Sequence, residues 1–147
     1  MQRVFDILLV EDNPADVEIT IEAFRRTHGG NRVHICRDGE EAIDFLHRRG
    51  KYARTTTPVP KPDLILLDLN LPGKSGLEVL QVIKQTDGLK TIPVVVLTTS
   101  DRDEDVSRCY LHGTNSYLTK PVQFDECLQL VASIQEYWLS LTKLPPR

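Results

Sequence analysis

The chain has 147 residues, a formal net charge of −3 and 40% hydrophobic residues, which leaves room for one compact domain, expected over residues 1–147. The small excess of acid argues against a nucleic-acid partner. The apolar runs are far shorter than the roughly 20 residues that span a bilayer, so no membrane partner is expected. The N-terminus has no signal-peptide cleavage region, and three cysteines without a CxxC pair fit a reducing compartment, so we expect a cytoplasmic protein.

Short apolar runs alternate along the chain with segments in which apolar residues recur at helical spacing. Several of these runs are continuous rather than alternating, which is typical of parallel strands covered on both faces. The alternation predicts an α/β fold with a doubly wound five-stranded parallel sheet, (βα)5. The predicted strands are 7–10, 33–36, 64–67, 94–97 and 116–119.

Helix starts and one long loop are also predicted. Asn13 before Pro14, and Ser75 before Glu78, are typical first-turn signals. Residues 48–62 hold five Lys or Arg, three Pro and no acid, which predicts an exposed loop. A docking edge for an acidic partner is the alternative interpretation of this loop.

Four strand ends carry chemically distinctive side chains: Glu11 and Asp12, Asp68, Thr98, and Lys120. The carboxyl ends of parallel strands meet at one edge of the sheet, so these residues should lie together. Clustered carboxylates repel one another unless a cation lies among them, and Mg²⁺ prefers such oxygen ligands.

A carboxylate beside Mg²⁺, with a lysine and a hydroxyl facing the same volume, is suited to accept a phosphoryl group. Asp68 is the expected acceptor because it follows the most apolar strand, while Glu11 and Asp12 are better placed as metal ligands. For any one of these acids alone, a loop-end cap or a solvated charge is the simpler interpretation.

The segments VEDN, LILLDLNLPGKSG, VVVLTTS and SYLTKP, in this order, resemble the CheY-like receiver domain of two-component response regulators. The resemblance covers nearly the whole chain and implies a flavodoxin-like strand order. It also implies that a sensor histidine kinase phosphorylates Asp68. Asp12 and Asp68 would bind Mg²⁺ through side chains, Asn70 through its main-chain carbonyl, and Glu11 through a metal-bound water. Many receivers have aspartate where this chain has Glu11.

The same resemblance implies further roles near the phosphoryl group. Thr98 would be the switch hydroxyl, Lys120 the lysine that contacts the phosphate, and Thr99 a donor through its N–H. Tyr117 matches the switch aromatic. The bond between Lys120 and Pro121 is expected to be cis.

A narrower resemblance links FLHRRGKY, the Pro-rich insertion and SIQEYWLSLTKLP to single-domain regulators of phytochrome-type kinases, which are typically homodimers. The last helix, expected over 124–141, has an apolar stripe longer than a core of about 5–135 can cover, so residues 136–147 are expected to form an extension. The alternative is that Trp138 folds back onto its own domain. The predicted dimer interface comprises Ile134, Tyr137, Trp138 and Leu141.

Three classes of function therefore stay open. The favoured one is a phosphorylation switch that signals by protein contacts and is not a metabolic enzyme, although it would phosphorylate and dephosphorylate itself as the resemblance implies. A flavin- or nucleotide-binding domain of the same fold is disfavoured, because Glu11 and Asp12 would repel the ligand phosphate. The third is an interaction-only receiver that no longer accepts phosphate.

Overall fold

The computed structural model describes residues 4–26 and 30–147, which contain a parallel sheet of five strands. The strand order is β2-β1-β3-β4-β5, so the order reverses between β1 and β3, as in the flavodoxin-like fold. The predicted α/β fold is confirmed. The strands are β1 (Asp6–Val10), β2 (Arg32–Cys36), β3 (Leu64–Leu67), β4 (Val94–Thr98) and β5 (Ser116–Thr119).

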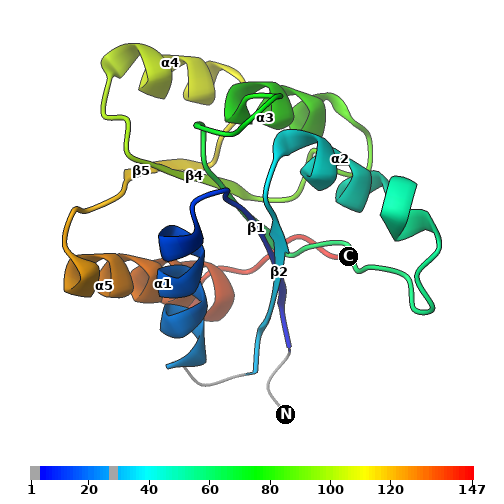
Figure 1. Cartoon of the computed structure of the whole chain (residues 1–147), viewed down its shortest axis with the longest axis horizontal. Coiled ribbons are helices and arrows are strands. Elements are labelled where there is room, and N and C mark those ends of the chain that lie inside the picture. The colour runs from blue at the N-terminus through cyan, green and yellow to red at the C-terminus, as the bar shows by residue number, and fades with distance from the viewer. Residues whose placement is uncertain (1–3, 27–29) are drawn as a thin grey trace.

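The helices cover both faces of the sheet (Figure 1). Helices α1 (Pro14–Arg25) and α5 (Phe124–Gln135) pack on one face, while α2 (Gly39–His47), α3 (Gly76–Gln85) and α4 (Asp103–Leu111) pack on the other. The continuous apolar runs are explained by this sandwich, since both faces of β1, β3 and β4 are buried.

Side-chain caps set where the first and third helices begin. The Asn13 Oδ1 accepts hydrogen bonds from the N–H groups of Ala15 (2.9 Å) and Asp16 (3.2 Å). The Ser75 Oγ accepts from the Glu78 N–H at 3.3 Å. Both predicted starts are confirmed, and the Asn13 cap makes α1 begin close to the end of β1.

The segment 48–62 is mostly exposed, as predicted, and contains the short 3₁₀ helix η1 (Gly50–Ala53). Tyr52 anchors it, because its ring packs edge-to-face against Phe45 with 5.1 Å between ring centroids. The first part of this loop is therefore held against α2.

The last helix continues past α5 through the π-helical segment η2 (Glu136–Leu141), so helical structure spans 124–141 as predicted. The chain then differs from the expected extension. Leu139 and Leu144 are buried in the core beneath α1 and α5, because the residues after η2 turn back onto the domain. The core therefore includes Leu139 and Leu144 of the tail.

The cysteines Cys36, Cys109 and Cys127 are free thiols, and the first two are buried. Among the residues that the structure describes, no helix combines the length and the apolar character needed to cross a lipid bilayer.

Candidate functional site

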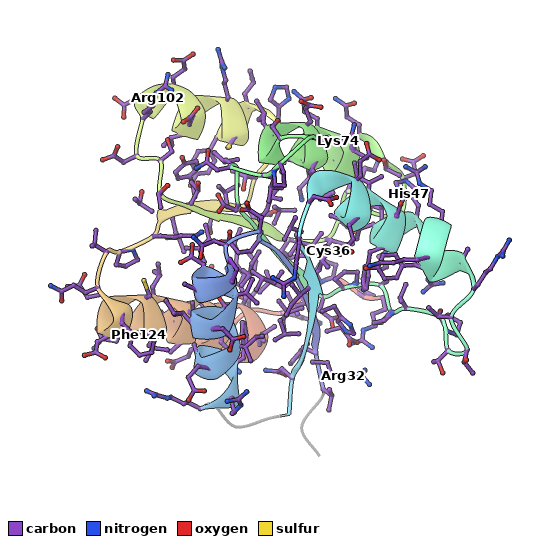
Figure 2. The ribbon with its side chains drawn as sticks, in the orientation of Figure 1. Arg32, Cys36, His47, Lys74, Arg102 and Phe124 are labelled. Atoms are coloured by element: carbon purple, nitrogen blue, oxygen red, sulfur yellow. The ribbon has the colours of Figure 1, made fainter. Side chains whose placement is uncertain are left out.

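The sheet itself positions two of the acidic residues. The Glu11 N–H donates to the Cys36 carbonyl at 3.0 Å, and the Asp68 N–H donates to the Val10 carbonyl at 3.1 Å. Strand pairing thus continues one residue past β1 and β3. Cys36 marks this carboxyl edge of the sheet, and Arg32 marks the opposite end of β2 (Figure 2).

Three carboxylates gather at this edge, from Glu11, Asp12 and Asp68, with one oxygen of each within 4.8 Å of the others. Glu11 and Asp68 are buried, whereas Asp12 is exposed. Such a set fits a hard divalent cation, since Mg²⁺ binds a few carboxylate oxygens and keeps several waters on its open side.

Lys120 lies among the carboxylates, and its side chain is only 8% exposed. Its ammonium pairs with Glu11, and its Nζ is 2.9 Å from both the Asp68 Oδ2 and the Asp16 Oδ2. The three N–H donors of the ammonium therefore have three carboxylate partners.

The expected cis bond between Lys120 and Pro121 is wrong, because this bond is trans. Trans is the ordinary form even before proline. The Lys120 N–H already donates to the Thr98 carbonyl at 2.7 Å, so pairing with β4 directs the lysine toward the site without a cis bond.

The Asp68 carboxylate is held at both oxygens. Its Oδ1 accepts from the Thr98 Oγ1 at 2.8 Å and from the Asn70 N–H at 3.0 Å. Its Oδ2 accepts from Lys120. Three donors from three separate segments therefore fix the orientation of this carboxylate.

The two buried acids, Glu11 and Asp68, have pKa values shifted in opposite directions. Burial acts to raise the pKa of Asp68, but the hydrogen bonds from Lys120 and the Asn70 N–H outweigh it and hold that pKa below its usual range. Burial, aided by the charge of Asp68, raises the pKa of Glu11 to about 7 despite Lys120. Burial works against the charge on Lys120, yet its carboxylate partners raise its pKa above the usual range. Asp68 is consequently ionised at neutral pH, as a nucleophile or metal ligand must be.

Of the remaining predicted site residues, Thr99 lies on the loop after β4 and Tyr117 lies on β5. The Thr99 Oγ1 accepts a long hydrogen bond of 3.5 Å from the Asn70 Nδ2. The Tyr117 hydroxyl donates to the Ser100 carbonyl at 2.8 Å, and its ring packs against the core on the α2–α4 face. Tyr117 thus contacts the loop after Thr98 and not the carboxylates.

Asp16 is a site residue that sequence reasoning missed. It lies in the first turn of α1 and reaches Lys120, 104 residues along the chain. The available signal was positional: a helix that starts directly after Glu11 and Asp12 directs the acid of its first turn toward the same edge.

The predicted dimer residues divide into two groups. Ile134 is 4% exposed in the core of its own domain, and Trp138 is half-buried against that core. Tyr137 and Leu141 are 55% and 71% exposed. Only this second group presents a large apolar surface.

A family model, response regulator receiver domain, matches residues 7–132. The probable methanogenesis regulatory protein FilR2 of Methanothrix harundinacea is 43% identical over 141 residues, covering 96% of this chain and 88% of that protein. Response regulator Rcp1 of Synechocystis sp. is 45% identical over 139 residues, covering 95% of this chain and 92% of that protein.

Solved structures agree with these matches. The phosphorylated cyanobacterial phytochrome response regulator RcpA superposes with a TM-score of 0.91 at 44% identity, covering 98% of this chain and all of that one. The Mn²⁺-bound form of Rcp1 superposes with a TM-score of 0.90 at 44% identity, covering 97% of this chain and 99% of that one.

Proposed function

Because the chain belongs to the response regulator receiver family, we propose that it accepts one phosphoryl group on Asp68 from a sensor histidine kinase and signals through protein contacts. The observation that carries the proposal is the buried Asp68 carboxylate, held by Thr98, Asn70 and Lys120 beside a cation-binding group of acids. The phosphorylated state of RcpA supports it.

The chemistry needs one nucleophilic oxygen. An oxygen of Asp68 attacks the phosphorus of a phosphohistidine, the phosphorus–nitrogen bond breaks, and the imidazole leaves with a proton from solvent. Mg²⁺, held by Asp12, Asp68, the main-chain carbonyl of Asn70 and, through a water, Glu11, would neutralise charge on the transferring group. The Mn²⁺-bound form of Rcp1 supports this ligand class.

The other site residues complete the acceptor. Lys120 offers its ammonium to a phosphoryl oxygen, and Thr98 exchanges its bond to Asp68 for one to the phosphate. The Thr99 N–H supplies another donor. Movement of Thr98 would release the loop whose Ser100 carbonyl binds the Tyr117 hydroxyl.

Intact mass after incubation with a small phosphodonor tests the proposal. We expect a single phosphate adduct that requires Mg²⁺, is lost in Asp68→Asn and persists in Asp87→Asn, a control at an acid with a 95% exposed side chain. A wild-type protein that folds and binds Mg²⁺ but gains no adduct from either a small donor or a phosphorylated kinase would instead be an interaction-only receiver.

We assign the kinase to the phytochrome type and the reaction to the cytoplasm. Rcp1 and RcpA are named as response regulators, the latter of a phytochrome, and the free thiols fit a reducing compartment. Phosphoryl transfer from a purified phytochrome kinase should be much faster than from an unrelated histidine kinase. Equal rates from both kinases would contradict this assignment.

The chain should also form a homodimer through the exposed part of its last helix. Replacing Tyr137 and Leu141 together by Ser should give a monomer in light scattering, because both side chains are exposed and apolar. Leu111→Ser, at an 81% exposed leucine on α4, is the matched control and should not change the mass. Point variants are preferable to truncation after Ile134, which would also remove buried Leu139. Unchanged mass in the double variant would rule out this interface.

A further inference from the structure

The position of Lys120 creates a conflict with cation binding. Its ammonium pairs with Glu11 and Asp68, and both belong to the group of carboxylates that fits a divalent cation. A cation bound there and the ammonium would repel each other and compete for the same oxygens. The lysine must therefore yield these two partners while staying close enough to meet a phosphoryl group.

Asp16 is the third partner of Lys120, and it stands apart from the carboxylates grouped around the cation position. The two side-chain atoms, Nζ of Lys120 and Oδ2 of Asp16, are 2.9 Å apart. The main chain of Asp16 is held independently of the lysine, because its N–H donates to the Asn13 cap at 3.2 Å. Its carboxylate lies in the first turn of α1, where the helix dipole favours negative charge.

The surroundings leave space for the lysine to shift. A cavity of about 20 Å³ between α1 and α5 is lined by Asp16, Lys120 and Pro121, together with apolar side chains of both helices. This volume would hold about one water molecule, so the Lys120 ammonium has space to shift beside Asp16, which it already contacts.

We propose that Asp16 is a positioning residue that retains the Lys120 ammonium beside the site when a divalent cation takes over Glu11 and Asp68. The proposal rests on the function proposed above and adds a residue to it. Without Asp16, the remaining partners of the lysine would all be cation ligands, so the lysine would compete more strongly with the cation.

Mg²⁺ binding measured by calorimetry in a double-mutant cycle tests this role. Asp16→Asn should weaken Mg²⁺ binding by about 3- to 10-fold when Lys120 is present. In a Lys120→Ala background the same substitution should change affinity by less than about 2-fold, because no ammonium is left to position. Equal weakening in both backgrounds would overturn the proposal, since Asp16 would then act only as a nearby charge.

Two further variants complete the cycle. Asp16→Glu keeps a carboxylate and should restore affinity to within about 2-fold of wild type, whereas affinity as weak as in Asp16→Asn would argue against the proposal. Glu18→Gln, at an exposed acid on the same helix, should leave binding unchanged; weakening equal to that of Asp16→Asn would show a general effect of charge on α1 and overturn the proposal.

These outcomes distinguish the role of Asp16 from the proposed function. If wild type binds Mg²⁺ and the cycle shows coupling but no phosphate adduct forms on Asp68, the proposed function fails while the positioning role stands. If the adduct forms and the cycle shows no coupling, only the role of Asp16 is overturned.

Discussion

The two edges of the parallel sheet both bury carboxylates beside basic groups, but they differ in the number of acids that each basic group must serve. At the carboxyl edge one lysine, Lys120, is shared by three acids, Glu11, Asp16 and Asp68, and Asp12 lies next to them. Negative charge is in excess there.

At the amino edge, the end of the sheet where the strands begin, the two buried acids pair with two arginines, and Arg147 approaches both acids. Asp6 accepts from the Arg32 Nε at 2.9 Å and from its guanidinium again at 3.1 Å, and the His34 Nε2 is 2.9 Å from the same carboxylate. Asp63 pairs with Arg147, whose Nε donates at 2.9 Å. The Asp6 N–H also donates to Asp63, at 2.9 Å.

Among the residues that the structure describes, the difference explains why the carboxyl edge suits a ligand better than the amino edge does. A guanidinium can donate two hydrogen bonds to one carboxylate, so the acids at the amino edge have their hydrogen-bond partners without a bound cation. Through Arg147, these contacts also attach the C-terminal tail to the sheet. The carboxyl edge shares one ammonium among several acids, so a divalent cation and then a phosphoryl group can enter. Similar residue types thus serve stability at one edge and chemistry at the other.

The largest effect on stability is expected from removing the Lys120 ammonium, which the acids at the carboxyl edge share. Lys120→Met should lower the free energy of unfolding by about 3 kcal/mol without metal, because buried Glu11 and Asp68 lose their ammonium. Urea unfolding in EDTA measures this loss, and Mg²⁺ should recover part of it. Lys90→Met, at an exposed ion pair, should cost less than about 0.5 kcal/mol. Equal stability of Lys120→Met and wild type in EDTA would contradict the interpretation that the Lys120 ammonium stabilises the buried acids.

A smaller loss is expected at the amino edge. Asp6→Asn should lower the unfolding free energy by about 2 kcal/mol, with or without Mg²⁺, because Arg32 and His34 lose a buried acceptor. The matched change at the other edge, Asp12→Asn, should leave metal-free stability unchanged or slightly higher, since it relieves repulsion. Finding that Asp12→Asn destabilises the metal-free protein as much as Asp6→Asn would remove the distinction between the edges.

The smallest effect is a pH dependence of stability that arises from Asp6 at the amino edge. Burial acts to raise the pKa of Asp6, but hydrogen bonds from His34 and Arg32 outweigh it and hold that pKa below its usual value. The stabilisation is therefore complete above the unfolded pKa of about 3.9 and is lost as pH falls through the lower folded value. The stability difference between wild type and Asp6→Asn should be constant from neutral pH to about pH 5 and shrink in stronger acid. A difference that grows on acidification would contradict this sign.

Much of the site could be predicted because its residues lie at or directly after the ends of apolar runs. Asp68 comes after LILL, and Thr98 ends VVVLT. Parallel strands bring their carboxyl ends to one edge, so residues far apart in the sequence were expected to meet there. Asp16 was missed because it follows no strand. Its contact with Lys120 depends on how α1 packs beside the end of β5.

The sequence by itself determined the order of strands and helices along the chain, the buried faces and the candidate phosphoryl acceptor, because these depend on local apolar periodicity and on residues at strand ends. The tertiary structure decided what periodicity does not encode. It placed Ile134 and Leu144 in the core of their own domain, and it left Tyr137 and Leu141 exposed. An apolar stripe shows only that a surface will be covered; whether the same chain or a partner covers it depends on where the chain turns after the helix.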